Sequence, residues 1–454
     1  MNSLEERKEL IYKLDGRPPF LAALPLGLQH VLSMFTSNLA PCFIVTGVVG
    51  LAGADRILMV QCAMLVSGLT TFLQLYPISV FGKKSNLPRI GAELPIVMGT
   101  SFAFVPTSIT VAKAFGLPGV LGAALLGSLI EFVMGFFIKP LKRVFTPLVI
   151  GAVLISIGIN LLDAGRDYFL GGAGAPDYGS AQNIALGFMV FFTILLCQRF
   201  GRGILRVSSL LAGITVGYAA AFFLGKLDFS LMREAAWFSL PRPFQFGYEF
   251  HAGAVLSFAA LYIVSGLETI GNTSGITVAA FDREATTRET SGAVMADSFG
   301  SALAAVFNTL PNTAFGQNAG LVAMTKVVNR FCLATGAAVL VLAGFIPKIG
   351  AVFSMMPNSV LGGAVISVFA MIMINGIKLI ARAGFSGRNI IVLSVMFALG
   401  LGLANAPGAA FEHMPPLFRH LFSDSVAAVC VIGIILNLVF PAEEAAAPAV
   451  IEVD

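Results

Sequence analysis

The chain alternates long apolar runs with short polar segments, and this alternation continues from residue 21 to residue 440. A membrane-spanning helix needs about 17–25 mainly apolar residues, and the run can be shorter where Gly or Pro interrupts it. On this criterion the sequence predicts fourteen spans. Their ranges are 21–48, 57–76, 92–112, 118–138, 144–164, 183–199, 205–226, 252–280, 290–306, 311–328, 330–347, 354–375, 388–405 and 419–440.

The distribution of Lys and Arg supports this count, because cytoplasmic segments of membrane proteins carry an excess of both residues. With the N-terminus inside, the inner segments hold 20 and the outer segments 8 of the 28 Lys and Arg residues. We therefore predict that both termini are cytoplasmic, with residues 1–20 as the N-terminal segment and 441–454 as the tail. Residues 228–250, which include Trp237, form an outer loop in this prediction.

Composition narrows the class of protein. With 57% hydrophobic and 11% charged residues, the chain is typical of a multi-pass protein embedded in the lipid bilayer of a cell membrane. The net charge of +4 comes from scattered residues, which argues against nucleic-acid binding. The five cysteines are isolated, so neither a disulfide framework nor a metal site is expected. The first 20 residues lack an apolar core, so we expect no cleaved signal peptide.

Fourteen spans divide into two sets of seven near residue 228, and an odd number per half gives the halves opposite orientations. The third span of each half is short and interrupted: PIVMGTSFAFVP runs from Pro95 to Pro106, and PNTAFGQNAG begins at Pro311. Matched broken spans in an inverted repeat indicate a transporter's binding site. The alternatives are close helix packing at the first segment and a polar loop at residues 311–326.

Two acids lie within apolar runs. Glu268 is in the middle of the eighth span, where a carboxylate costs about 2.5–3.5 kcal/mol or more, so a functional role is favoured over a structural hydrogen bond. Asn272 follows at i+4 and shares its helix face. Asp297, in the ninth span, is the second buried acid; its alternative role is to cap a broken helix.

Three further ionisable residues lie in the predicted spans. His30, in the first span, is either a proton relay or an orienting hydrogen-bond partner, and the orienting role is favoured. Glu131 and Asp163 lie nearer the ends of their spans, where exposure at the membrane interface explains them.

Several of these motifs resemble the nucleobase–ascorbate transporter family, also called nucleobase:cation symporter-2. Its signature is Q/E/P-N-x-G-x-x-x-x-T followed by Arg, Lys or Gly. The matching residues are Gln317, Asn318, Gly320, Thr325 and Lys326, together with Gln29-His30, the GTSF motif from Gly99 to Phe102, Glu268 and Asp297.

The resemblance implies an all-α polytopic membrane protein built as a 7+7 inverted repeat, with short strands breaking spans 3 and 10. A core domain would comprise residues 21–140 and 251–350, and a gate domain residues 141–227 and 351–440. Homodimerisation is a further implication.

The resemblance also implies a substrate site. The acid matching Glu268 and the amide matching Gln317 would bind the base, and backbone N–H groups near Phe102 and from Phe315 to Gly316 would complete the site. Thr100, Ser101 and Asn318 are assigned to it as well. A glutamine at position 317 is similar to the branch that transports oxidised purines, xanthine or urate, whereas glutamate is similar to the uracil branch.

The function expected from the sequence is proton-coupled import of an oxidised purine. Proton coupling is assigned to Glu268 and Asp297, with His30 and Asn272 beside them, and no cofactor is expected. Asn272 stands where several family members carry a titratable group. Sodium coupling is less favoured. A symporter for uracil or another base, an anion exchanger of the same architecture and an intramembrane enzyme are the alternatives, and the absence of HExxH, GxSxG and P-loop motifs argues against the enzyme.

Overall fold

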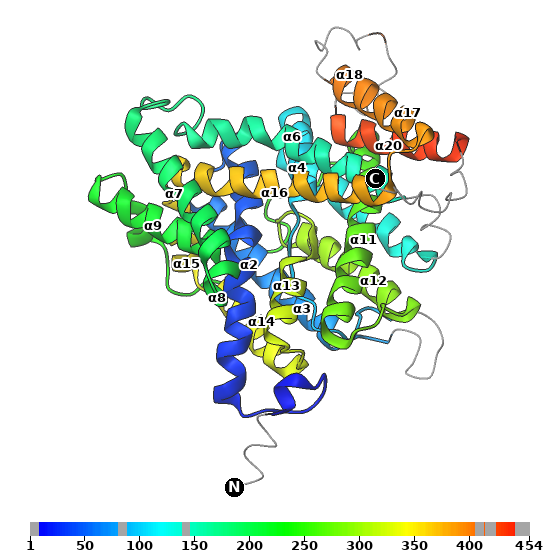
Figure 1. Cartoon of the computed structure of the whole chain (residues 1–454). Coiled ribbons are helices and arrows are strands. Elements are labelled where there is room, and N and C mark those ends of the chain that lie inside the picture. Colours follow the sequence, from blue (N-terminus) through cyan, green and yellow to red (C-terminus); the bar gives the residue numbers. More distant parts are fainter. Residues whose placement is uncertain (1–8, 80–88, 139–145, 405–412, 414–423, 441–454) are drawn as a thin grey trace, which may run out of the picture.

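The computed structural model describes residues 9–79, 89–138, 146–404, 413 and 424–440 (Figure 1). Helices dominate this part of the chain, and two short strands lie among them. In chain order the elements are η1 (Leu10–Tyr12), α2 (Phe20–Val48), α3 (Gly53–Leu75), β1 (Met98–Thr100), η2 (Phe102–Phe104), α4 (Val105–Met134), α6 (Pro147–Phe169), α7 (Ala181–Phe200), α8 (Ile204–Val207), α9 (Ser209–Phe223), α10 (Ser230–Glu234), α11 (Ala252–Phe281), α12 (Thr287–Val306), β2 (Asn312–Ala314), α13 (Gln317–Thr325), α14 (Arg330–Gly344), α15 (Pro347–Ser354), α16 (Asn358–Ala383), α17 (Gly387–Val395), the π-helical η3 (Met396–Leu401), α18 (Gly402–Ala404) and α20 (Ser425–Val439).

The chain is a multi-pass membrane protein. Seven helical segments of its described part are long and apolar enough to cross a membrane, and the bent pair α14 and α15 raises the number to eight. The count of fourteen spans stays a prediction. Parts of the last two spans, residues 1–8 of the N-terminal segment and the whole tail 441–454 lie outside the described residues.

The helices pack in two groups. The first contains α2, α3, α4, α11, α12 and α14, and the second contains α6, α7, α9, α16 and α20. In Figure 1, α16 lies across the molecule beside α6 and α7, while α2 and α14 descend together towards the N-terminus. These groups correspond in sequence to the predicted core and gate, although the domain boundaries stay a prediction.

Glycines permit the close crossing of α6 and α16. A Cβ atom added at Gly151 would lie 2.7 Å from the backbone oxygen of Gly376, and one added at Gly376 would lie 2.6 Å from the oxygen of Gly151. Small residues at such crossings let helix backbones approach within a membrane, where van der Waals packing drives association. The two helices therefore form a tight pair.

The two strands join the halves of the sequence. β1 and β2 pair antiparallel, with Met98 opposite Ala314 and Thr100 opposite Asn312. Asn38 of α2 fixes β1, because its Oδ1 accepts hydrogen bonds from the Thr100 backbone N–H at 2.7 Å and the Thr100 hydroxyl at 3.0 Å. Each strand is followed closely by helix, η2 and α4 after β1 and α13 after β2. Backbone outside the helices is thus buried in protein, as membrane depth requires.

The expected separation of the third and fourth spans corresponds to a kink inside α4. Gly116 has φ +67° there, and Pro118 follows it. Glycine adopts this conformation without the steric cost that a side chain would add.

Candidate binding site between the two groups of helices

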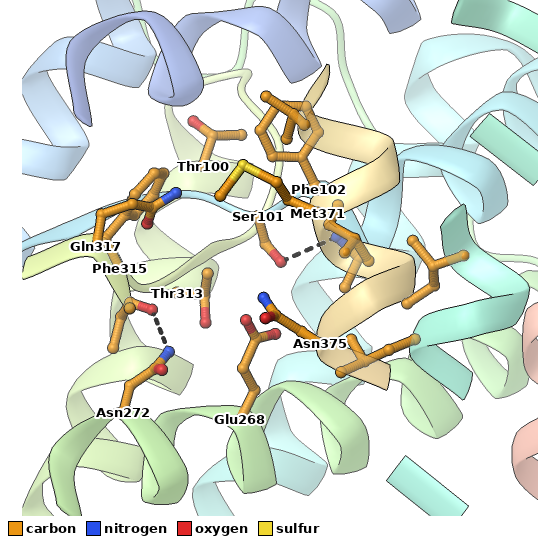
Figure 2. A pocket seen from close by; sticks show the side chains of 17 residues that line it. Thr100, Ser101, Phe102, Glu268, Asn272, Thr313, Phe315, Gln317, Met371 and Asn375 are labelled. Carbon is orange, nitrogen blue, oxygen red and sulfur yellow. Dashed lines mark hydrogen bonds between the residues drawn. The ribbon is translucent and has the colours of Figure 1, made fainter. Parts of the chain in front are cut away.

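A cavity of about 320 Å³ lies between the strand region of the first helix group and the α6–α16 pair of the second (Figure 2). Its size is at the lower end of the range for small-ligand pockets. The lining residues are Thr100, Ser101, Phe102, Ala103, Leu154, Ile157, Glu268, Asn272, Thr313, Ala314, Phe315, Gly316, Gln317, Val368, Met371, Ile372 and Asn375.

Glu268 of α11 supplies the one carboxylate among these lining residues. In Figure 2 its oxygens point away from α11 towards Asn375, which comes from α16 on the opposite wall. Within the described part of the chain, Glu268 has neither an ion-pair partner nor a hydrogen-bond donor. Its oxygens are therefore free to accept hydrogen bonds from a ligand.

Gln317 is the first residue of α13, so its side chain and the N-terminal end of that helix face the cavity together. The first N–H groups of a helix have no intrahelical partner and remain open to a ligand. The Phe315 N–H is engaged, because it donates to Val97 O at 3.0 Å. Backbone donors for a ligand must therefore come from neighbouring positions such as Gly316 and Gln317.

Asn272 contributes to the wall of the cavity while it anchors β2. Its Nδ2 donates to the backbone oxygen of Ala314 at 2.7 Å. One of its donors is thus committed to the strand, which gives the residue a positioning role here.

Two phenylalanines provide apolar surface around the cavity. Phe315 follows β2, and Phe102 begins the helix after β1. The Phe102 ring meets Phe369 of α16 edge-on, with 6.1 Å between ring centroids. This contact joins the two helix groups directly beside the cavity.

The sequence interpretation missed the polar residues Asn375 and Thr313. Asn375 lies on α16 and presents an amide from an otherwise apolar wall, while Thr313 is the central residue of β2. The sequence signal for Asn375 was a lone amide at the end of the predicted span 354–375. Thr313 could be placed at the cavity only with knowledge of the register of the strands.

Asn318 and His30 do not line the cavity. The His30 Nδ1 is hydrogen-bonded to the Asn318 Oδ1, and the Asn318 Nδ2 donates to the backbone oxygen of Pro95. Both side chains are buried. Their geometry is that of supports, which hold α13 against α2 and the segment before β1.

Asp297 lies behind the cavity wall. Its Oδ2 accepts hydrogen bonds from the Thr269 hydroxyl and, at 3.4 Å, from the Thr313 hydroxyl. The side chain is fully buried. Thr313 therefore connects this acid to the cavity.

The expectation that Glu131 is exposed at the membrane interface was wrong. Its residue exposure is 0%, because α11 and α12 both pack against α4. Asp163 is exposed as expected, and its carboxylate pairs with Arg166 at 3.0 Å.

The described residues contain no group of three or more His, Cys, Asp or Glu side chains placed to hold a metal ion. The cavity is instead lined by one carboxylate, several amides and hydroxyls, and apolar rings. Such a set suits an organic ligand with hydrogen-bonding groups along its edge.

Comparison with known proteins decides the family. The protein-family model Xan_ur_permease, which describes the Permease family, matches residues 21–409. The chain belongs to the nucleobase–ascorbate transporter family of permeases. It is therefore a membrane transporter and not an enzyme.

Family members of similar length are 30–34% identical to the chain. A protein of Clostridium perfringens, provisionally named as a purine permease, is 34% identical over 95% of this chain and 93% of its own. A xanthine permease of Bacillus subtilis is 32% identical over 93% of this chain and 95% of its own. The xanthine permease XanQ of Escherichia coli is 30% identical, with coverage of 95% and 94%.

Solved transporters share the fold at much lower identity. The transmembrane domain of the cyanobacterial bicarbonate transporter BicA aligns with a TM-score of 0.56 at 15% identity, over 92% of this chain and 97% of that chain. The murine anion transporter Slc26a9, solved inward-facing, aligns with a TM-score of 0.66 at 11% identity, over 95% of this chain and 70% of that chain. The chain described here thus has the architecture of 7+7 inverted-repeat transporters.

Proposed function

We propose that the protein is a proton-coupled symporter that imports an oxidised purine, xanthine or urate, by alternating access. The observation that carries the proposal is the open carboxylate of Glu268 in a cavity that also presents Gln317 and lies between two separately packed groups of helices. The names of the relatives support a purine as substrate.

The chemistry of the cavity fits a purine dione. Such a base carries alternating N–H donors and carbonyl acceptors along a planar edge. Glu268 offers acceptors for ring N–H groups, whereas the Gln317 amide offers both a donor and an acceptor. Phe102 and Phe315 supply apolar surface for the ring. Asn375 is placed to add a donor or acceptor from the gate wall, so that closure of α16 on the substrate completes its coordination.

Proton coupling is assigned to the buried acids. Glu268 holds the base, and Asp297 keeps the hydrogen-bond network behind it in the proton-loaded state. A proton that moves inward gains about 2.3 kcal/mol per 100 mV of membrane potential, which is sufficient to drive substrate accumulation. No cofactor takes part in this scheme, and sodium is the less favoured coupling ion.

Uptake of radiolabelled xanthine and urate tests the proposal, with unlabelled bases as competitors. We expect accumulation that a protonophore abolishes and that sodium does not restore. Glu268→Gln should lose accumulation, while Asp163→Asn, which changes an exposed acid that does not line the cavity, should behave as wild type. Accumulation that survives the protonophore and requires sodium would exclude proton coupling.

An anion exchanger is the second candidate, because the solved structures of the same fold include a bicarbonate transporter and an anion transporter. The uncompensated carboxylate of Glu268 disfavours it, since this group repels a small inorganic anion such as chloride, which has no ring N–H group to donate to the carboxylate. Competition of bicarbonate and chloride against xanthine uptake separates the two functions. We expect no competition from either anion, and competition from uracil identifies the broader nucleobase alternative.

The orientation and assembly of the protein are part of the same proposal. Both termini are cytoplasmic in a bacterial inner or plasma membrane, and two copies form a homodimer. Activity of a periplasmic reporter fused to the C-terminus would overturn the orientation. The mass of the purified protein in detergent, measured by light scattering, tests the dimer.

A further inference from the structure

The first helix group contains a further buried acid, Glu131, which has no part in the site described above and lies beside Asp297. The carboxyl groups of Glu131 on α4 and Asp297 on α12 lie close enough to interact with each other. Both residues have an exposure of 0%. They lie on helices that pack directly against each other, and α11 packs against both.

The pair has few other partners. In the described part of the chain, no other residue donates a hydrogen bond to either oxygen of Glu131 or to Asp297 Oδ1. No ion pair there involves either acid. The ionisable groups that face the pair are Tyr262 and Glu268, both on α11. The Tyr262 hydroxyl donates to the backbone oxygen of Ala124 at 2.9 Å, so it does not neutralise the pair.

Two buried carboxyl groups that interact and lack a cationic partner favour a state in which at least one of them holds a proton. An ionised carboxylate has only acceptors, and two like charges at this separation cannot both ionise in a buried site. Gly266 lets α11 approach Glu131 closely, because a Cβ added there would lie 3.3 Å from Glu131 Oε1. The pair is therefore enclosed by helices on the sides that the structure describes.

Asp297 also connects the pair to the cavity. Its Oδ2 accepts hydrogen bonds from the hydroxyls of Thr313, which lines the cavity, and of Thr269, which follows Glu268 in the sequence. One turn further along α12, the Ser301 hydroxyl donates to the Asn312 oxygen at 3.1 Å and accepts from the Asn312 N–H at 3.0 Å. A change in the charge of the pair thus acts on α12 where that helix holds β2.

We propose that Glu131 and Asp297 together bind the coupling proton, with Glu131 as a further coupling residue of the transporter. The inference rests on the proposed proton symport. In this scheme the pair gains a proton when the cavity opens outward and releases it when the cavity opens inward. Thr269 and Thr313 transmit the change to the substrate site, while Glu268 remains free to hold the base.

Two variants separate this role from a structural one. Glu131→Gln keeps the size of the side chain and an N–H donor towards Asp297, but it cannot release a proton. Glu131→Asp retains a titratable carboxyl and shortens the side chain by one methylene. A purely structural hydrogen bond is better preserved by Gln than by Asp, whereas a proton-binding role is preserved only by Asp.

The experiment compares both variants with wild type and with Asp163→Asn in proteoliposomes. It measures xanthine accumulation driven by a pH gradient, xanthine exchange without a gradient, and the pH profile of uptake. We expect Glu131→Gln to accumulate xanthine at least about tenfold less than wild type, with a flattened pH profile and with exchange still present, given the driving force on a proton. Glu131→Asp should recover much of the accumulation and a pH-dependent profile.

The outcomes separate this inference from the proposed function. Wild-type accumulation that ignores the proton gradient refutes the symport itself. If wild type is proton-driven while Glu131→Gln keeps normal accumulation and a normal pH profile, only the role of Glu131 is refuted. Absence of both variants from the membrane, with Asp163→Asn present, would assign the pair a structural role and overturn the inference as well.

Discussion

Replacement of Gly376 by alanine tests the tight crossing of α6 and α16. The new Cβ would lie 2.6 Å from the Gly151 oxygen and 3.0 Å from the Ile155 backbone nitrogen. Ordinary van der Waals contact begins at 3.4 Å, so the α6 backbone must retreat by about 0.8 Å (3.4 − 2.6). Both obstacles are backbone atoms, which cannot rotate away as a side chain can.

The expected cost follows from this overlap. Overpacking of a close-packed interface destabilises a protein by about 1–3 kcal/mol. Because Asn375 precedes Gly376 on α16, the same displacement shifts the gate wall of the cavity, and we expect substrate affinity to fall as well. Thermal unfolding of the purified protein in detergent measures the first effect, and the concentration dependence of xanthine uptake measures the second.

Gly387→Ala is the matched control, because no atom lies within 4 Å of its added Cβ. Gly376→Ala also gains the higher helix propensity of alanine, about 0.8–1.0 kcal/mol within a helix interior, so its measured loss of stability understates the cost of the overlap at the crossing. Equal unfolding temperatures and equal apparent affinities for the two variants would refute the tight packing inferred here.

Three further predictions concern the site and its surroundings. Gln317→Glu should weaken uptake of purine diones at least about tenfold, because an acceptor replaces a donor and leaves a carbonyl unpaired; unchanged apparent affinity in a variant shown to be in the membrane would exclude contact with substrate. Asn38→Ala should cost about 1–3 kcal/mol of stability and lower uptake, since both Thr100 donors lose their acceptor; thermal unfolding and transport assays measure this. The hydrogen bond from Lys226 holds the pKa of Asp177, in the loop between α6 and α7, below its ordinary value. The stabilisation is therefore present above the ordinary pKa and is lost as pH falls through the lowered value, so Lys226→Met should reduce thermal stability more at neutral pH than in strong acid, where only the hydrogen bond from Lys226 to Asn183 Oδ1 is lost.

The broken spans and the main polar residues of the cavity could be predicted from sequence. A carboxylate in the middle of an apolar run and an amide beside glycines are unusual enough to stand out, and both Glu268 and Gln317 line the cavity. The role that the resemblance gives them stays a proposal. The sequence did not show that Gln317 lines the cavity while Asn318 does not, because both are amides beside glycines. Successive helical residues point about 100° apart, and the Asn318 side chain therefore points towards His30.

The surroundings of a side chain were harder to predict than its place along a span. Glu131 lies near the end of an apolar run, and such a position is exposed when its helix face meets lipid or water. Here the face meets α12, and the acid is buried beside Asp297. Asn375 presents the converse case, because a residue close to the predicted end of a span faces the centre of the cavity. In both cases the environment of the side chain is determined by a neighbouring helix that is distant in the sequence.

The pairing of β1 with β2 also bears on how the protein is made. Met98 pairs with Ala314, so the ladder cannot close until synthesis has passed the second strand. Until then the backbone groups of β1 that face its partner lack that partner, in a segment destined for the membrane interior. The hydrogen bonds of β1 are therefore completed only after the second half of the chain has been made, and the binding site cannot form before that point.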